Sequence, residues 1–484
     1  MSLSKPSFSV YTLGCKLNQL ESEALADAFC REGFDLLPWG TGEGAVPADL
    51  LLINTCTVTS MAEQKARRMI RKGLRENPGA SIIVTGCYAQ LEKAAIEALD
   101  DGSSGGKRLF VVPGDAKSAL LELPRFLAAA ESNSASLCSL IGAWVKAEAE
   151  ASAAVTEDAF RFVPGNFSSH SRGFLKIQDG CDKHCSYCRV TLARGHSVSL
   201  SAEKALADLK ALEEKGYGEA VLTGVNITQY CDGGGRDLGG LLEYLLAGTQ
   251  GICIRLSSLE PDGLTEGLMQ ALAHPRVRPH FHLSVQSGSP LILGRMGRSY
   301  DPGEVEKAAA RLRDIKADPF LACDIITGFP GETTAEFEKT YELCRRIGFA
   351  WIHAFPYSRR PGTAAWSFKN PVSEREAAER VSALLRLAKQ GRREYISRWI
   401  GKEAEAIVEG GDEKDTPLVQ ATSENYLKLA IDFPHTSRGE APAPGTLLHC
   451  RIKALPGGEA GGAAGRFDAA AEIVGQGAGF KIQA

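Results

Sequence analysis

Three cysteines stand close together in the stretch GCDKHCSYC, which runs from Gly180 to Cys188. Three residues separate Cys181 from Cys185, and two separate Cys185 from Cys188. Thiolates bind soft metals, so this spacing indicates either a zinc site or an iron–sulfur cluster. Structural zinc usually takes four ligands in two pairs, and no second pair follows here. Ferredoxin clusters also use four cysteines, in a different spacing.

Three thiolates on a four-iron cluster leave one iron open to a further ligand. An open iron can hold the amino and carboxylate groups of S-adenosylmethionine and pass an electron into its sulfonium, which releases a 5′-deoxyadenosyl radical. The pattern CxxxCxxC after the first strand of a (β/α)6 region resembles the signature of the radical S-adenosylmethionine (radical SAM) enzymes. A zinc loop or three incidental cysteines is the alternative.

The resemblance also implies cofactor contacts at the ends of later strands. LTGVN (Leu222 to Asn226), SVQSGS (Ser284 to Ser289) and DIITGFPGE (Asp324 to Glu332) are similar to segments that relatives place around S-adenosylmethionine. The residues expected to bind this cofactor are Thr223, Gly224, Asn226, Ser257, Gln286, Asp324 and Gly328. No catalytic residue is expected beyond the cluster ligands.

Three further cysteines lie far apart in the sequence. Cys15, Cys56 and Cys87 occur in TLGCKLNQLESE, NTCTVT and TGCYAQ, each at or just beyond the carboxyl end of an expected strand. A parallel sheet would bring these ends to one edge. The alternative is that they are small core residues, as most free cysteines are. That alternative is our prediction for the remaining cysteines, which are Cys30, Cys138, Cys231, Cys253, Cys323, Cys344 and Cys450.

The motifs around Cys15, Cys56 and Cys87, followed by GCDKHCSYC and a terminal β-barrel, resemble those of the tRNA methylthiotransferases. The resemblance implies that Cys15, Cys56 and Cys87 hold a second four-iron cluster whose open iron binds the sulfur. It thus implies two 4Fe-4S clusters and S-adenosylmethionine as cofactors. One S-adenosylmethionine would donate a methyl group to sulfur, and another would yield the radical that activates an aromatic C–H bond.

Shorter sequence motifs indicate a branch of this family. TLGCKLNQ, GFLKIQDGC and FPYSRRPGT are most similar to the branch that acts on carbon 2 of threonylcarbamoyl-adenosine beside the tRNA anticodon. Sister branches act on isopentenyl-adenosine or on a ribosomal-protein aspartate, and a zinc-stabilised RNA-binding protein is the non-enzymatic alternative. Thr191 stands where relatives commonly have proline. The implied partners are the tRNA anticodon arm, an electron donor such as flavodoxin or ferredoxin, and a sulfur source.

The elements that must position these residues form an α/β protein with three units. Continuous apolar runs alternating with helical sequence predict a doubly wound parallel sheet over residues 7–118. Residues 119–168 are expected to be a linker or an insertion. Six strand-like runs predict an open parallel (β/α)6 barrel over 169–400, with the active site at the strand ends. Short strands with Gly- and Pro-rich loops predict a small β-barrel over 401–484, which resembles an RNA-binding TRAM domain.

Composition indicates the compartment. The 13 cysteines are odd in number and irregularly spaced, and the N-terminus shows no apolar signal-peptide core, so disulfides are not expected. The longest apolar runs are strand-sized, which predicts a soluble cytoplasmic protein without a membrane partner. The net charge of −4 argues against a uniformly cationic surface but allows local basic patches.

Two basic patches are candidates for RNA binding. KARRMIRKGLR, residues 65–75, contains no acidic residue, and a second basic group follows residue 386. A solvated face is the alternative for each patch. The residues expected to contact phosphate are Arg67, Arg71, Arg392, Arg393, Arg398 and Lys402. Tyr426 and Phe433 in the barrel could stack on bases, but we favour a core position for both.

Overall fold

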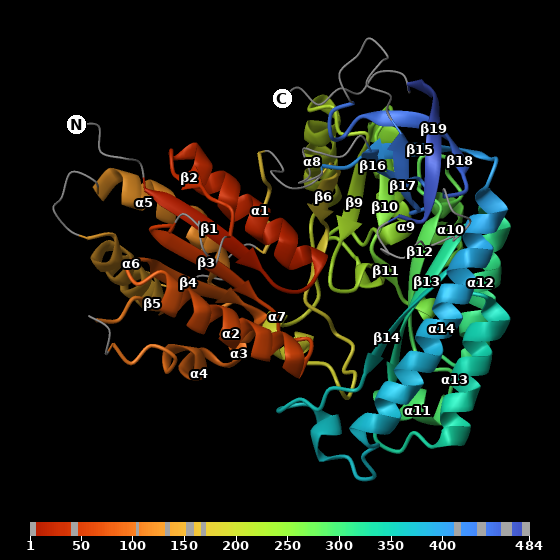
Figure 1. Cartoon of the computed structure of the whole chain (residues 1–484), viewed down its shortest axis with the longest axis horizontal. Helices are drawn as coiled ribbons and strands as arrows, with labels where there is room; N and C mark the ends of the chain where they lie inside the picture. Colours follow the sequence, from red (N-terminus) through yellow and green to blue (C-terminus); the bar gives the residue numbers. More distant parts are fainter. Residues whose placement is uncertain are drawn as a thin grey trace.

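The computed structural model describes residues 6–39, 47–102, 106–130, 136–151, 159–165, 171–410, 418–432, 442–455 and 467–476. Figure 1 shows an N-terminal unit, in red and orange, beside a central unit in green and cyan. A small barrel, in blue, lies against the central unit. These three units correspond to the predicted α/β fold class.

The N-terminal unit contains a parallel sheet with the strand order β2-β1-β3-β4-β5. Its strands are β1 (Ser7–Thr12), β2 (Asp35–Leu36), β3 (Leu50–Thr55), β4 (Ser81–Gly86) and β5 (Leu109–Val111). Leu50 and Leu52 face one core, and Leu51 and Ile53 face another on the opposite side. Both faces are therefore buried, as the continuous apolar runs predicted. The helices are α1 (Lys16–Arg31), α2 (Ser60–Glu76), α3 (Cys87–Leu91) and α4 (Lys93–Glu97).

The segment expected to be a linker or insertion contains helices. They are η1 (Lys117–Leu121), α5 (Leu123–Ala130) and α6 (Leu137–Ala151). Leu127, Ile141 and Trp144 are buried in the same hydrophobic core as Phe8 of β1. The described part of this segment therefore packs onto the sheet, and the N-terminal unit extends beyond residue 118.

The central unit is an open parallel barrel. Its strands run in chain order as β6 (Gly173–Lys176), β9 (Glu219–Thr223), β10 (Cys253–Leu256) with β11 (Ser258–Leu259), β12 (His280–Gln286), β13 (Phe320–Thr327) and β14 (Trp351–Pro356). Ser257 divides the third of the six predicted strands into β10 and β11. A short antiparallel pair, β7 (Gln178–Asp179) and β8 (Val198–Ser199), flanks the cysteine loop.

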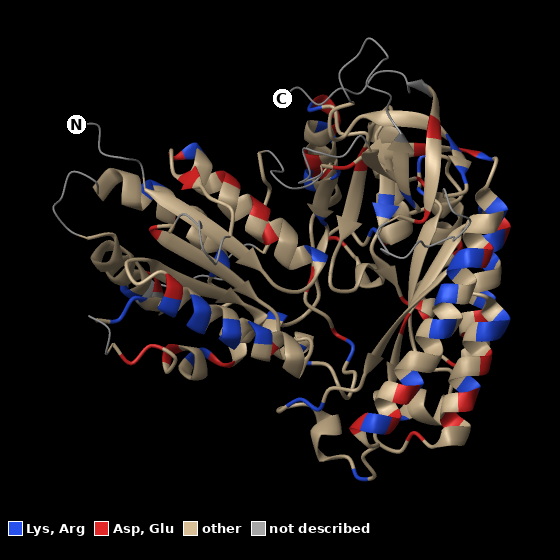
Figure 2. Ribbon diagram, viewed as in Figure 1, with Lys and Arg blue, Asp and Glu red and all other residues tan. Residues whose placement is uncertain are grey.

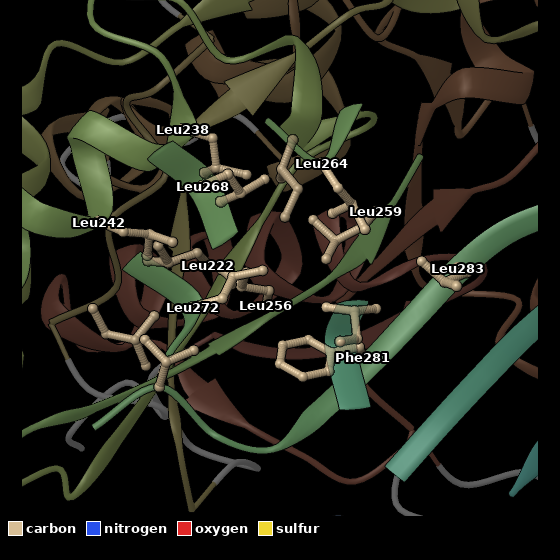
Figure 3. Packing of buried hydrophobic residues seen from close by; sticks show 14 of the residues in the cluster. Leu222, Leu238, Leu242, Leu256, Leu259, Leu264, Leu268, Leu272, Phe281 and Leu283 are labelled. Atoms are coloured by element: carbon tan, nitrogen blue, oxygen red, sulfur yellow. The ribbon is translucent and has the colours of Figure 1, made fainter. Parts of the chain in front are cut away.

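Helices cover the outside of this barrel. They are α8 (Ala202–Glu214), α9 (Leu238–Gly248), α10 (Glu266–Leu272), α11 (Pro290–Met296), α12 (Pro302–Ile315), α13 (Thr334–Ile347) and α14 (Glu374–Trp399), with short turns η2 (Ile227–Gln229), η3 (Pro261–Gly263) and η4 (Ala364–Ser367). The short helix α7 (Val190–Arg194) follows the cysteine loop and contacts α3 of the N-terminal unit instead. Figure 3 shows leucines of α9 and α10 packed against strand residues such as Leu222 and Phe281. Side-chain caps at Ser201, Thr333 and Ser373 satisfy N–H groups at three of the helix starts.

The C-terminal unit is a closed barrel with the strand order β15-β16-β17-β19-β18. The strands are β15 (Glu403–Val408), β16 (Leu418–Ser423), β17 (Lys428–Asp432), β18 (Leu447–Lys453) and β19 (Ala469–Gln476). Phe320 of β13 and Trp399 of α14 belong to the same hydrophobic core as the barrel. The barrel is therefore attached to the central unit by a shared core. None of the helices in the described ranges has the length and apolar character that crossing a bilayer requires.

Candidate active site

The N-terminal cysteines lie at the carboxyl ends of three adjacent strands. Cys15 follows β1 and precedes α1, Cys56 follows β3, and Cys87 follows β4 as the first residue of α3. The strand order reverses between β1 and β3, because β2 lies on one side of β1 and β3 on the other. In open α/β sheets, such a reversal leaves a crevice in which ligands bind. The thiols are close enough for their charges to influence one another.

Glycines directly before two cysteines allow close packing of the loops. Gly14 has a φ of +107°, and a Cβ atom there would lie 2.8 Å from Cys56 Sγ. Gly180 has a φ of +67°, and a Cβ atom there would lie 1.8 Å from the carbonyl oxygen of His196. A side chain at either position would clash and would strain the backbone. These glycines therefore help to fix the positions of the cysteine loops.

Burial controls the ionisation of the N-terminal thiols. Desolvation raises the pKa of Cys56 to about 12, although the Val58 N–H donates to its Sγ at 3.4 Å. Desolvation also raises the pKa of Cys15, although its side chain is exposed. Arg194 Nε donates to Cys87 Sγ at 3.3 Å. Formation of three thiolates here thus depends on positive charge, from Arg194 and from a bound cluster.

The central cysteines lie on the loop between β7 and α7. The Lys183 N–H donates to Cys181 Sγ at 3.4 Å, and the Val190 N–H donates to Cys188 Sγ at 3.3 Å. Ser186 anchors the loop, because its N–H and its hydroxyl both donate to carbonyl oxygens at the end of α11. Hydrogen bonds to sulfur stabilise thiolates and tune iron–sulfur clusters. Desolvation raises the pKa of all three thiols, that of Cys188 to about 12.

The donor sets match iron–sulfur clusters better than a single ion. In the described ranges, His, Cys, Asp and Glu side chains form no group of three that could hold a metal ion as they stand. Each cysteine set offers three sulfur donors at the edge of a parallel sheet, which is the ligand type of a cluster with one open iron. Ligation by these six cysteines stays a prediction that rests on ligand type and on convergence of the loops.

Three of the residues expected to bind S-adenosylmethionine lie beside the central cysteine loop. Thr223 is buried at the end of β9, next to β6. The Asn226 N–H donates to Gln178 Oε1 at 2.8 Å, and the Asn226 side chain hydrogen-bonds to Cys181. A Cβ atom at Gly224 would lie 2.8 Å from the same Gln178 oxygen. The LTGVN turn therefore contacts the loop that carries the thiols.

The other expected cofactor residues are spread over three strand ends. Ser257 Oγ is buried without a hydrogen-bond partner in the described structure, and it lies where β10 gives way to β11. Gln286 ends β12 with a φ of 64°. The Gly328 N–H donates to Glu332 Oε2 at 2.6 Å. Asp324 lies within β13, three residues before the last residue of this strand. Their roles toward the cofactor stay predictions.

Arg194 links the two cysteine sites and was missed by the sequence argument. It lies six positions after Cys188 and reaches into the N-terminal unit, where its guanidinium contacts Cys87 and donates to Glu21 Oε1 at 3.0 Å. It also donates to Asp179 at 2.9 Å. Desolvation opposes ionisation of Glu21, but Arg194 and two buried lysines, Lys117 and Lys176, hold its pKa well below the usual value.

Glu63 makes a second connection between the cysteine sites. Its Oε1 accepts from Thr57 Oγ1 at 2.6 Å and from Arg189 Nη1 at 3.0 Å, and it also pairs with Arg360. Thr57 directly follows Cys56, and Arg189 directly follows Cys188. One buried carboxylate therefore joins the residues next to both sets of thiols. No sequence signal pointed to it, because Arg189 and Arg360 are each more than a hundred positions from Glu63 along the chain.

The structure divides the expected RNA-binding residues into two groups. Figure 2 shows basic residues along α2 and α14. Arg71 and Arg393 are exposed, and Lys402 is exposed above the Trp399 ring. Arg67 donates to Tyr88 Oη at 2.8 Å. The two remaining residues are held by carboxylates, through the pairs Arg392–Asp468 and Arg398–Asp318.

Arg392 in particular connects α14 to the barrel, since Asp468 directly precedes β19. Tyr426 packs against His280 with ring centroids 4.2 Å apart and lines the barrel core, as favoured from the sequence. Phe433 lies outside the described residues.

All 13 cysteines are free. The core position predicted for the remaining seven is confirmed for Cys253, Cys323, Cys344 and Cys450, which are buried. It is wrong for Cys30 and Cys231, which are exposed, and Cys138 is half-buried. That prediction did not consider whether each cysteine lies on the buried or the exposed side of its segment, and this side determines whether the cysteine is in the core.

Comparison with known proteins gives the family. Residues 175–344 match the Radical SAM superfamily, and residues 7–104 match a family described as Uncharacterized protein family UPF0004. The chain is 41% identical over 469 residues to the threonylcarbamoyladenosine tRNA methylthiotransferase MtaB of Treponema pallidum, covering 88% of this chain and 94% of that protein. It is 31% identical to the tRNA-2-methylthio-N(6)-dimethylallyladenosine synthase of a Jannaschia species, covering 89% of each.

Among solved structures, the radical S-adenosylmethionine methyltransferase TsrM from Kitasatospora setae matches with a TM-score of 0.48 and 14% identity, covering 75% of this chain and 77% of that one. The family matches define a radical SAM enzyme. Within that class, the chain belongs to the tRNA methylthiotransferase family, in the branch of the MtaB proteins. The family and the branch expected from the sequence are confirmed.

Proposed function

We propose that this protein attaches a methylthio group to carbon 2 of threonylcarbamoyl-adenosine beside the anticodon of tRNA. The observation that carries the proposal is the meeting of two sets of three cysteines across one interface, joined through Glu63 and Arg194. The named activity of the MtaB relatives supports the choice of substrate.

The cofactors are S-adenosylmethionine and two 4Fe-4S clusters. When bound, these groups supply the methyl group, the sulfur site and the radical that activates an aromatic C–H bond. Cys181, Cys185 and Cys188 would hold one cluster, and Cys15 and its two partners Cys56 and Cys87 the other.

The residues of the chain itself hold and orient these groups. The buried Ser257 hydroxyl, which has no hydrogen-bond partner in the described structure, is free to bind a polar atom of S-adenosylmethionine, and the Asn226 N–H fixes the LTGVN turn to Gln178 beside the central loop. The Glu63 network excludes water from part of the interface, since Glu63, Arg189 and Arg360 are all buried. Rigid spacing matters because the reacting groups must be held in a fixed near-attack geometry.

The partners follow from this chemistry. The anticodon arm of tRNA would lie against the exposed basic residues of α2 and α14, such as Arg71 and Arg393. An external electron donor of the flavodoxin or ferredoxin type and a sulfur source are required, because the chain supplies neither electrons nor labile sulfur. A tRNA substrate would place the protein in the cytoplasm.

Mass spectrometry of tRNA nucleosides tests the proposal. Cells that lack the protein should accumulate threonylcarbamoyl-adenosine and lose its 2-methylthio form, and the wild-type chain should restore it. If the wild-type chain restores 2-methylthio isopentenyl-adenosine instead, the protein has the function of the sister branch. An unchanged tRNA profile, together with zinc and no labile sulfide in anaerobically purified protein, would support the non-enzymatic alternative.

A further inference from the structure

The segment between β14 and α14 contacts both cysteine-bearing units. Ser358 Oγ accepts a hydrogen bond at 2.9 Å from the N–H of Ser60, which begins α2 of the N-terminal unit. The Ala365 N–H donates at 2.7 Å to the carbonyl oxygen of Ser186, within the central cysteine loop. Figure 1 shows this segment in cyan, between β14 and α14. Its residues therefore lie next to the place where the two cysteine sites meet.

An exposed indole and a guanidinium are paired on this segment. Trp366 of η4 is 42% exposed, and the guanidinium carbon of Arg359 lies 4.6 Å from the centroid of its ring. Arg359 Nε donates to the Trp366 carbonyl oxygen at 2.7 Å. In the ranges that the structure describes, no carboxylate pairs with Arg359, and its Nη atoms have no acceptor. Aromatic rings and guanidinium planes are the groups on which unpaired nucleic-acid bases stack.

The turn that carries Trp366 is fixed by its neighbours. Ala365 is 1% exposed and lies in a hydrophobic cluster with Ile292 and Phe329. The Trp366 N–H donates to the Thr363 carbonyl oxygen at 3.1 Å, and Thr363 is itself buried. The indole is therefore held in place before any ligand binds, which reduces the entropic cost of binding.

A row of exposed basic residues leads to the same place. Arg68, Arg71 and Arg75 are exposed on α2 at spacings of three and four, so they share one side of this helix. Figure 2 shows the basic residues along α2. Met61, which is 72% exposed, continues this side to the start of the helix, where Ser60 meets Ser358. An RNA strand whose phosphates follow α2 would thus bring its bases to Trp366.

We propose that Arg359 and Trp366 form a platform on which an unpaired base next to the target adenosine stacks, and that the free Nη atoms of Arg359 contact the adjoining phosphate. The inference rests on the proposed function and adds a second contact to it, outside the reacting nucleotide. Every base has a flat face, so the platform accepts any base. It positions the anticodon loop and does not select the modification.

A binding experiment tests the platform. Two anticodon stem-loop RNAs with threonylcarbamoyl-adenosine are compared, one intact and one in which the two nucleotides beside the target are abasic. We expect the reconstituted wild-type protein to bind the intact RNA about tenfold more tightly, the usual effect of one base–aromatic stack. Trp366→Ala should bind both RNAs with the weaker affinity, and Trp366→Phe should keep most of the preference. Arg359→Gln should reduce the salt dependence of intact-RNA binding by about one unit of slope.

Phe126→Ala is the matched control, because Phe126 is an aromatic residue of similar exposure, 39%, on α5 of the N-terminal unit. It should keep the wild-type preference. Iron content is measured for each variant, since Ala365 contacts the central cysteine loop. If Trp366→Ala loses iron, Trp366→Leu replaces it, because leucine keeps an apolar side chain there without a flat face.

Equal affinity of wild type for both RNAs would overturn the inference. An undiminished preference in the Trp366 variant that lacks a ring would also overturn it, even if that variant binds both RNAs more weakly. Failure of the proposed function is a separate result, in which wild type forms no methylthio product on the intact RNA.

Discussion

At the scale of single residues, the proposed function depends on six thiols. They form two sets of three, which come together in different ways. Cys181, Cys185 and Cys188 are close in sequence, so their loop predicts its own site. The N-terminal cysteines become a set only because β1, β3 and β4 are adjacent in a parallel sheet. Both sets were predicted from the sequence, one by spacing and the other by the expected sheet edge together with the resemblance to the tRNA methylthiotransferases.

A cysteine substitution in one set should leave the cluster of the other set intact. In Cys185→Ala, loss of one of three thiolates should abolish 5′-deoxyadenosine formation from S-adenosylmethionine, while about half of the iron, that of the N-terminal cluster, is retained. Product analysis and iron determination after anaerobic reconstitution measure both effects. Cys56→Ala is the control, and it should still form 5′-deoxyadenosine but no methylthio product. Undiminished 5′-deoxyadenosine from Cys185→Ala would refute the ligand assignment.

At the scale of elements, buried ion pairs connect the central unit to the C-terminal barrel. Glu219 of β9 is 1% exposed and binds Arg255 and Arg278. Arg255 Nη2 also donates to the Ser423 carbonyl of the barrel, and Arg278 pairs with Glu405 of β15. Sequence reasoning found the strands but not this network, because its members come from different units and carry no local pattern.

Glu219 should make stability depend on pH. Desolvation would raise its pKa, but the arginines lower it to about 2 from a usual 4.5. Because the pKa is lower in the folded state, the charged carboxylate stabilises the fold above about pH 4.5, and this contribution is lost as the pH falls toward about 2. The shift corresponds to about 3 kcal/mol.

We therefore expect urea unfolding of Glu219→Gln to show a lower midpoint than wild type at neutral pH, with the difference shrinking as the pH falls below about 4.5. Glu403→Gln is the control, since its pair with Arg451 is largely exposed and should be worth about 0.5 kcal/mol. A difference between wild type and Glu219→Gln that stays constant down to about pH 3 would contradict the role of this charge.

The exposed basic residues of two helices lead to a prediction about tRNA binding. Arg71 on α2 and Arg393 on α14 are exposed, so their replacement by glutamine should weaken tRNA binding and reduce its salt dependence by about one unit of slope each. Arg392 pairs with Asp468, and Arg392→Gln should lower thermal stability with little change in that slope. Binding titrations over a salt series and melting curves measure the two effects. A larger reduction of the salt-dependence slope in Arg392→Gln than in Arg393→Gln would show that Arg392, and not Arg393, contacts tRNA phosphate.

The segment after residue 118 shows what the sequence argument missed. Its composition, rich in Ala, Ser and Glu, suggested a linker or a partly helical insertion. However, the apolar residues of α6 follow helical spacing, and Leu137, Leu140, Ile141, Trp144 and Val145 pack toward the core of the N-terminal unit. Periodicity would have identified this helix and its buried face, which the composition did not specify.

At the scale of the whole molecule, the central question is how two cysteine sites on different units keep a fixed separation. Glu63 is bonded to Thr57, Arg189 and Arg360, which come from three separate segments. Arg189 also donates to Glu92 at 2.9 Å. This network was not predictable from sequence, because it forms only when both units are folded and docked.

Weakening this network should uncouple the two sites. In Glu63→Gln, both clusters and 5′-deoxyadenosine formation should be retained, but the amount of methylthio product per 5′-deoxyadenosine should fall by about tenfold, because small misplacements of reacting groups are costly. Chromatography of both products in one reaction measures the ratio. Glu97→Gln, at an exposed pair with Lys93 on α4, should leave it unchanged. An unaltered ratio in Glu63→Gln would show that the separation is set elsewhere.

The most direct test of the account is the product of the reconstituted enzyme. The protein, loaded anaerobically with iron and sulfide and supplied with reductant, a sulfur source and S-adenosylmethionine, is incubated with anticodon stem-loops that carry threonylcarbamoyl-adenosine or isopentenyl-adenosine. Mass spectrometry of the digested RNA should show a methylthio group on threonylcarbamoyl-adenosine and none on isopentenyl-adenosine. Modification of the isopentenyl RNA alone, or of neither RNA by protein that holds both clusters, would contradict it.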